Sequence, residues 1–228
     1  MKFLSDRAHI RSFVLRKGKM TSGQQQAVDK LMPHYALTPD SPLDFSEIFG
    51  NDNPVWLDIG FGNGESIIHA AQKNPNVNFL GIEVHLPGVG RLLMAADEHN
   101  LDNIRIIRND AVDIIREFVP DDSLDAIHIY FPDPWHKKRH HKRRLVQQPF
   151  LDLIRPKLTA GGRLHFATDW QPYAEEVALL LEQNKDWLTN SQTESRFAPR
   201  PEWRPITKFE RRGQRLNHAS FDLIWTKN

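Results

Sequence analysis

The sequence predicts an α/β fold built on a parallel sheet, and two patterns support this prediction. From Pro54 onwards, short apolar runs alternate with segments of helical periodicity, which is typical of parallel strands joined by helical crossovers. A glycine-rich turn, Gly60–Gly64, directly follows the first of these runs. Such a turn lets the backbone approach a ligand at the carboxyl end of a strand, where open α/β sheets bind their ligands.

The expected elements continue that alternation to the end of the chain. We expect strands at 55–59, 78–84, 104–108, 124–131, 163–167 and 220–226. We expect helices at 65–73, 89–99, 111–118, 149–156 and 173–184. Gly161 and Gly162 are expected to cap the region after the fourth of these helices. Trp56, Trp187 and Trp225 flank or lie within apolar segments and are expected in the core.

The chain has 228 residues, enough for one substantial core or for one domain with an appendage. We divide it into a basic, partly flexible N-terminal extension at 1–50 and a domain at 51–228. Residues 21–31 have the pattern of a short helix, after which Pro33, Pro39 and Pro42 interrupt regular structure. Two interpretations of the extension stay open: a solvated tail, or an arm that folds onto a polyanion.

Composition excludes several classes of function. The chain has no cysteine, so it has no disulfide and no thiolate metal site, which fits the reducing cytoplasm. The first ten residues carry Lys2, Asp6 and Arg7 and no unbroken apolar stretch, so we expect no secretory signal there. No run approaches the roughly 18–20 apolar residues of a membrane-spanning helix. The net charge is only +1, but positive charge is concentrated at 7–19, 137–144 and 196–215, and this distribution favours a nucleic-acid partner.

The stretch from Leu124 to Leu145 combines three kinds of chemistry. An apolar strand ends at Phe131, and Pro132-Asp133-Pro134 then forces a turn, because proline cannot donate to a strand ladder. Six of the eight residues from Lys137 to Arg144 are Lys or Arg. A carboxylate, an aromatic ring and a cationic segment are therefore expected together at one strand end.

Acidic residues are expected at the carboxyl ends of the first three strands: Asp58, Glu83 and Asp110. A dinucleotide-binding fingerprint would need Gly or Ala at position 65, where this chain has Glu65, so an NAD dehydrogenase is disfavoured. The acids suit a ligand with an amine, a ribose and an adenine but no phosphate, which describes S-adenosylmethionine. A single acid at a strand end is more often a turn or helix cap, so the hypothesis depends on all three together.

These residues and several other motifs resemble the bacterial tRNA (guanine-N7)-methyltransferases. The matching motifs, in order, are RSFV at 11–14, LDIGFGNG at 57–64, GIEVH at 81–85, PGVG at 87–90, NDA at 109–111, FPDPWHK at 131–137, KRR at 142–144, ATDW at 167–170, PYAE at 172–175, TKFE at 207–210 and RG at 212–213. The glycine turn is generic to class I methyltransferases, whereas PDPWHKK with its basic cluster, and TKFE, are much more specific. The family more often has Glu where this chain has Asp58, so the contact to the cofactor amine is expected to become water-mediated.

The resemblance implies a seven-stranded, mostly parallel Rossmann-like sheet with helices on both faces. It implies transfer of a methyl group from S-adenosylmethionine to N7 of a guanine in the variable loop of tRNA, at position 46. Carried over by position, the cofactor-side residues would be Asp58, Gly60, Gly62, Gly64, Glu83, Asp110 and Asp133, with Asp133 also catalytic. The substrate-side residues would be Lys137, Asp169, Thr207, Lys208, Phe209 and Glu210. The RNA-binding residues would be Arg139, His140, His141, Lys142, Arg143 and Arg144.

Several roles stay open at this stage. Asp133 would offset the developing purine cation or accept hydrogen bonds from the guanine edge, and Asp169 would take the other task. Phe131 and Trp135 would stack on a splayed base, or serve as core and as a lid over the cofactor. The histidines near this loop have no recognised metal-ligand spacing, and the reaction needs no Lewis acid, so we expect no metal.

Two other functions stay as alternatives. A methyltransferase of the same fold acting on a protein or small molecule would explain the acids but leave the cationic segment at 137–144 unused. A non-catalytic RNA-binding protein would bind tRNA without consuming S-adenosylmethionine. We expect a cytoplasmic monomer or weak homodimer whose partner is tRNA.

Overall fold

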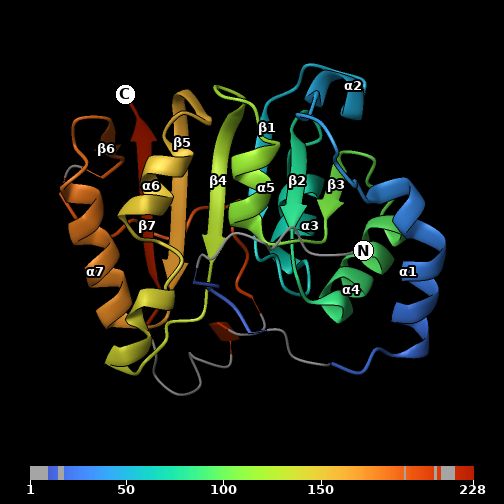
Figure 1. The fold of residues 1–228 in the computed structure, drawn as a ribbon, viewed down its shortest axis with the longest axis horizontal. Coiled ribbons are helices and arrows are strands. Elements are labelled where there is room, and N and C mark those ends of the chain that lie inside the picture. Colours follow the sequence, from blue (N-terminus) through green and yellow to red (C-terminus); the bar gives the residue numbers. More distant parts are fainter. Residues whose placement is uncertain (1–9, 15–17, 193, 208–209, 212–218) are drawn as a thin grey trace. The chain divides into compact units, whose positions relative to one another are not determined.

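The computed structural model describes residues 10–14, 18–192, 194–207, 210–211 and 219–228. These residues form two compact units. The first unit contains residues 18–120 and 203–205, and the second unit contains the remaining described residues. The seven strands have the order β3-β2-β1-β4-β5-β7-β6, so the predicted α/β fold with a mostly parallel, seven-stranded sheet is confirmed (Figure 1).

The first unit follows the predicted alternation of strand and helix. Its elements are α1 (Ser22–Tyr35), α2 (Phe45–Phe49), β1 (Val55–Ile59), α3 (Glu65–Lys73), β2 (Asn78–Ile82), α4 (Leu86–Glu98), β3 (Ile104–Ile107) and α5 (Ala111–Glu117). Strand β2 pairs in parallel with β1 on one side and with β3 on the other. All residues of β1 and β2 are buried, as expected for parallel strands covered on both faces.

Much of the N-terminal extension is packed into the first unit. Helix α1 begins with a capping box between Thr21 and Gln24, and it packs against α4 (Figure 1). It runs through Pro33 to Tyr35, beyond the predicted end, because packing outweighs the local preference of proline. Leu37 N–H donates to the carbonyl oxygen of Ile106 in β3 (2.8 Å). Residues 1–9 and 15–17 of the predicted flexible arm lie outside the described residues.

The second unit contains the parallel pair β4–β5 and an antiparallel edge. Strand β7 pairs in antiparallel fashion with β5 and with the short β6, which the sequence analysis did not predict. Its elements are β4 (Leu124–Tyr130), the 3₁₀ helix η1 (Lys138–Arg143), α6 (Gln148–Ile154), β5 (Leu158–Thr168), α7 (Gln171–Glu182), β6 (Leu188–Asn190) and β7 (Phe221–Lys227).

The glycine pair at 161–162 does not cap the helix before it, so that expectation is wrong. Strand β5 already begins at Leu158, and both glycines lie within it where the register with β4 shifts. Gly161 has a φ of 77°, and a Cβ on Gly162 would lie 2.8 Å from the carbonyl oxygen of Thr159. The glycines therefore allow a bulge in the strand.

A buried polar chain links three strands of the second unit. The Tyr130 hydroxyl lies 2.9 Å from His165 Nδ1, and His165 Nε2 lies 2.7 Å from Asp222 Oδ1. Since a carboxylate only accepts, His165 Nε2 donates to Asp222. Trp56, Trp187 and Trp225 are buried as predicted.

Candidate functional site

The glycine-rich turn after β1 combines unusual backbone angles with open space. Gly60, Gly62 and Gly64 have φ values of 71°, 57° and 82°, a region that glycine adopts without steric cost. A Cβ added to Gly60 or Gly62 would meet no atom within 4 Å, whereas one added to Gly64 would lie 2.9 Å from Leu92 Cβ. Gly64 is therefore required for close packing against Leu92 of α4. Gly60 and Gly62 leave room for a ligand beside the backbone.

Gly88 supports this turn from the start of α4. A Cβ at position 88 would lie 2.2 Å from the carbonyl oxygen of Gly62. No side chain is compatible with this approach unless the turn moves. The sequence analysis did not include Gly88 among the site residues, although it lies in the quoted PGVG motif.

Glu83, directly after β2, is buried and fastens the glycine turn through its carboxylate. Its Oε2 accepts a hydrogen bond from Gly62 N–H (2.8 Å), and its Oε1 accepts from Val84 N–H (2.6 Å) and His85 N–H (2.8 Å). A carboxylate has about four acceptor positions, and three are engaged here. A ligand with two vicinal hydroxyl groups would therefore have to displace at least one backbone donor.

Asp58, in β1, is 3% exposed, and its pKa departs strongly from the ordinary value of a carboxyl group. Burial, and secondarily the charge of Glu83, raise the pKa of its carboxyl group to about 7. A buried carboxyl group with this pKa is stabilised in its ionised form by a cationic ligand. The first unit thus has acceptors for an amine and for hydroxyl groups next to an open backbone turn, which fits the predicted cofactor.

Asp110 lies at the start of α5, where it also has a structural task. Its Oδ1 accepts a hydrogen bond from Val112 N–H (3.0 Å), which makes it the N-cap of that helix. Asn109 Oδ1 accepts from Asp110 N–H (2.8 Å). Asp110 therefore caps a helix, which is the usual role of an acid at a strand end. Its predicted contact with the cofactor stays a prediction.

The loop after β4 in the second unit holds Asp133 between two strained residues. Phe131 and Trp135 have φ values of 51° and 48°, although both carry bulky side chains. Such backbone costs on the order of 1–3 kcal/mol per residue and is concentrated at functional sites. Phe131 N–H donates to the carbonyl oxygen of Ala167 (2.8 Å), which fixes the first end of the loop, and Asp133 is exposed.

The loop after β5 lies beside the loop that carries Asp133. Asp169 is half-buried and directly follows the last residue of β5. The ring of the next residue, Trp170, meets the ring of His136 edge-on, with centroids 4.4 Å apart. The structure therefore brings Trp170, which the sequence analysis did not include, into contact with the Asp133 loop. The quoted ATDW motif was the available signal for it.

Four of the six Lys and Arg residues in the cationic segment at 137–144 are exposed. Lys137, Lys138, Arg139 and Lys142 are exposed, and Arg143 is half-buried. The pKa of His140 is lowered, first by desolvation and then by its cationic neighbours, beginning with Arg139. At neutral pH His140 therefore adds little positive charge to this surface.

Arg144 does not fit its predicted role as an RNA contact. Its side chain is 1% exposed and forms an ion pair with Glu176. Its Nε donates to the carbonyl oxygen of Pro134 (2.9 Å), and its guanidinium lies 4.6 Å from the Tyr173 ring. The buried side chain of Arg144 thus stabilises the loop at 132–134 through its hydrogen bond to Pro134. Sequence alone could not distinguish it from its exposed neighbours, because its burial depends on α7.

Thr207 and Glu210 form a reciprocal capping pair. Glu210 N–H donates to Thr207 Oγ1 (3.2 Å), and Thr207 N–H lies 3.4 Å from Glu210 Oε2. Both residues are buried. The predicted substrate-side residues Lys208 and Phe209 lie outside the described residues.

Two classes of feature are absent from the described part of the chain. None of its helices is long and apolar enough to cross a bilayer. No group of three or more His, Cys, Asp or Glu residues is placed there to bind a metal ion.

Comparison with known proteins gives consistent results. Residues 52–223 match a family described as "Putative methyltransferase". The chain is 47% identical to the tRNA (guanine-N(7)-)-methyltransferase of Klebsiella pneumoniae subsp. pneumoniae over 96% of this chain and 91% of that protein. It is 50% identical to the protein of the same name from Cupriavidus pinatubonensis, over 96% of this chain and 86% of that one.

Among solved structures, the 16S rRNA methyltransferase KamB matches with a TM-score of 0.57 at 15% identity, over 83% of this chain and 95% of that one. A 16S rRNA (adenine(1408)-N(1))-methyltransferase from Catenulisporales acidiphilia matches with a TM-score of 0.54 at 14% identity, over 82% and 92% of the two chains. At these identities the structural matches show a shared fold only. The sequence matches extend over nearly the whole chain, which belongs to the tRNA (guanine-N(7)-)-methyltransferase family.

Proposed function

We propose that this protein is a tRNA (guanine-N7)-methyltransferase that modifies a guanine in the variable loop of tRNA, at position 46. The proposal rests mainly on similarity over 96% of the chain to relatives named for this activity. The geometry supports it because the glycine turn and its acids suit S-adenosylmethionine, and because Asp133 lies beside a dense cationic segment.

S-adenosylmethionine supplies a methyl group bound to a positively charged sulfur. In the first unit, the open backbone at Gly60 and Gly62 would accommodate it, and Gly64 shapes the turn. Asp58 would face its amine, Glu83 its ribose hydroxyl groups, and Asp110 its adenine. The family resemblance implies Asp133, in the second unit, as a further cofactor-side residue.

The reaction makes modest demands on acid–base chemistry. N7 of guanine carries a free lone pair, so it reacts without losing a proton and requires no strong general base. The protein must hold the two reactants in line and stabilise the charge that moves onto the purine. The exposed carboxylate of Asp133 would take one of two tasks: to offset that charge, or to accept hydrogen bonds from the N1–H and N2 edge of the base. Asp169 would take the other task.

The substrate-side groups would hold the base and the RNA. Lys137, at the start of the cationic segment, would contact the substrate, together with the 207–210 motif (Thr207, Lys208, Phe209 and Glu210). Thr207 and Glu210 already hydrogen-bond to each other, so a substrate contact at either residue would add to that capping pair. Lys137, Lys138, Arg139 and Lys142 would provide most of the affinity through phosphate contacts, which carry little sequence preference.

His140, His141 and Arg143 would contribute to the same RNA-facing segment without acting as its main charges. The expected tRNA partner follows from this proposal, whereas the cytoplasmic location and the monomeric or weakly dimeric state stay predictions.

The deciding experiment incubates the protein with labelled S-adenosylmethionine and unmodified tRNA transcripts, and then applies borohydride–aniline cleavage to locate N7-methylguanine. One cleavage in the variable loop is expected. Label incorporation without cleavage would point to a different target atom. Absence of incorporation while S-adenosylmethionine still binds would support a protein or small-molecule substrate, and tRNA binding without any consumption of S-adenosylmethionine would indicate a non-catalytic RNA-binding protein.

A further inference from the structure

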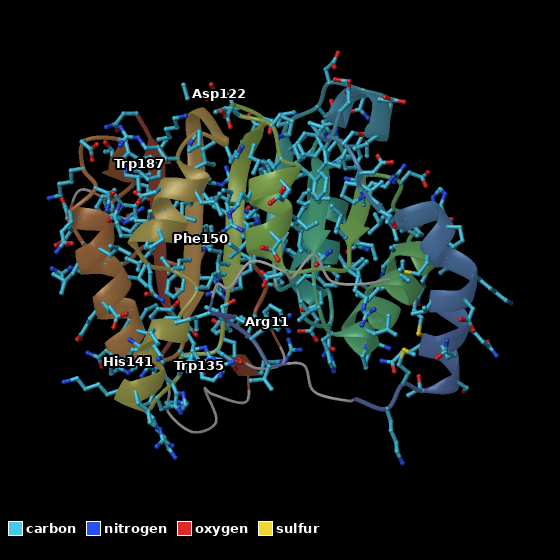
Figure 2. The ribbon with its side chains drawn as sticks, viewed as in Figure 1. Arg11, Asp122, Trp135, His141, Phe150 and Trp187 are labelled. Carbon is cyan, nitrogen blue, oxygen red and sulfur yellow. The ribbon has the colours of Figure 1, made fainter. Side chains whose placement is uncertain are left out.

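The N-terminal residues 10–14 belong to the second unit, where they meet the loop after β4. Trp135 Nε1 donates a hydrogen bond to the carbonyl oxygen of Ser12 (3.1 Å), a residue 123 positions away in the sequence. Arg143 donates from Nε to the carbonyl oxygen of Arg11 and from Nη2 to that of Phe13, both at 3.2 Å. Figure 2 shows Arg11 close to Trp135. Trp135 in the loop and Arg143 in η1 thus bind three consecutive backbone carbonyls.

Arg143 and Trp135 act as one structural pair. The guanidinium of Arg143 lies 4.1 Å from the centroid of the Trp135 ring. The planar fork of arginine suits this position, because its plane can stack on the ring while its N–H groups donate in fixed directions, and the compact ammonium of lysine has no such plane or fork. Two of the donors that would otherwise face an RNA phosphate are engaged with residues 11 and 13.

The same contacts explain how Trp135 keeps its strained backbone. A bulky residue with a φ of 48° persists only where its surroundings fix it strongly. The indole of Trp135 is fixed at its edge by Ser12 and on its face by Arg143. Trp135 stands two residues after Asp133, so whatever holds Trp135 also holds the second end of the Asp133 loop.

We propose that Trp135 and Arg143 are positioning residues that dock residues 11–13 onto the Asp133 loop and thereby keep Asp133 in its working position. The N-terminal segment is then part of the scaffold of the methyl-transfer site, and Arg143 serves that scaffold rather than acting as one of the main RNA-binding charges. The link to catalysis rests on the proposed function, whereas the docking itself does not.

Arg143→Lys separates docking from charge, because it keeps the positive charge and removes the fork and the stacked plane. We expect kcat to fall by about ten- to a hundredfold, while the salt dependence of tRNA binding keeps its slope. Lys142→Ala removes an exposed charge from the same segment, and we expect it to weaken tRNA binding and to lower the salt slope by about one. Arg155→Lys, the same exchange at the C-cap of α6, is the matched control and should leave kcat unchanged. A reduced salt slope with unchanged kcat in Arg143→Lys would overturn the proposal.

A double-mutant cycle tests whether Arg143 acts through the N-terminal segment. Deletion of residues 1–14 should lower kcat at least as much as Arg143→Lys does. In the deleted protein, Arg143→Lys should then have less than about a twofold further effect, because its docking partner is gone. Full additivity of the two changes would contradict the proposal.

Hydrogen exchange on the protein without substrates tests the docking directly. Arg143→Lys should speed amide exchange in residues 10–14 and in residues 131–136, with the thermal midpoint little changed. Unchanged exchange in both segments would overturn the docking. If the wild-type protein transfers no methyl group to tRNA, the proposed function fails, but the exchange measurement still decides whether the segment is docked.

Discussion

The two units hold their candidate functional residues in different ways. In the first unit, the backbone makes the site: glycines with positive φ leave space, and three backbone N–H groups fasten Glu83. In the second unit, side chains from distant parts of the sequence hold an exposed Asp133. Arg144 reaches Glu176, 32 positions away, and Arg143 reaches Arg11, 132 positions away. Local sequence therefore determines the first arrangement, and tertiary packing determines the second.

We expect the largest effect on activity from a change at Asp133, the exposed carboxylate of the second unit. Asp133→Asn preserves size and removes the charge, so we expect kcat to fall by about 10²–10³-fold, as when one stabilising group is removed elsewhere. Single-turnover kinetics of methyl transfer to tRNA measure this fall in rate. Calorimetric titration with S-adenosylhomocysteine should show that the first unit still binds its ligand. Near-normal turnover with intact binding would remove the catalytic role from Asp133.

The stability of the second unit should depend strongly on Arg144. Arg144→Met removes the hydrogen bond to Pro134 and the contact with Tyr173, and it leaves Glu176 without its cation. Because the Glu176 side chain is 44% exposed and can be hydrated, we expect a loss of about 2–3 kcal/mol, below the usual cost of breaking a fully buried pair. Arg139→Met on the exposed surface should change stability by less than about 0.5 kcal/mol in urea unfolding. Equal effects of the two variants would show that Arg144 is not a structural residue.

Because glycine backbone shapes the candidate ligand site of the first unit, one added methyl group should weaken ligand binding there. Gly88→Ala places a Cβ 2.2 Å from the carbonyl oxygen of Gly62, so the turn must shift. We expect S-adenosylhomocysteine to bind about tenfold more weakly. Gly23→Ala in α1 is the matched control, because its Cβ would make an ordinary contact with Met94, 3.4 Å away, and it should leave that affinity unchanged. Wild-type affinity in Gly88→Ala would show that the turn tolerates displacement.

The smallest expected effect is a pH dependence of cofactor binding. Since the pKa of Asp58 is raised to about 7, the carboxyl group is largely protonated at pH 5.5 and ionises as the pH rises towards 7.5. Below about pH 7.7 the ligand's amine stays mostly protonated. Affinity for S-adenosylhomocysteine should therefore rise by about three- to tenfold between pH 5.5 and 7.5. Asp58→Asn should bind with little pH dependence, and an unchanged profile would exclude Asp58 as the source.

The elements of the first unit could be predicted well from the sequence, because short-range patterns encode them. Strand β1, the glycine turn and helix α3 are encoded by local periodicity and glycine positions, so their order and limits could be read from residues 55–73. The end of helix α1 was missed because packing against α4 carries it past Pro33. The pair Gly161–Gly162 was misassigned because a bulge and a helix cap require the same residue type.

The second unit was harder to predict, because residue type does not reveal burial. Arg143 and Arg144 stand next to each other in a cationic run, yet one binds an N-terminal segment and the other lies under a proline loop. Thr207 and Glu210 carried a local signature, since Thr-x-x-Glu is the pattern of a capping box, and the structure contains that pair. Their predicted contact with the substrate stays a prediction.

The central claim is that the protein methylates N7 of one guanine in the variable loop of tRNA. The most direct test uses a tRNA transcript in which that guanine alone is replaced by 7-deazaguanine, which has carbon in place of N7. Labelled S-adenosylmethionine should transfer its methyl group to the unmodified transcript and not to the substituted one, while both transcripts bind with similar affinity. Equal incorporation into both would contradict the claim.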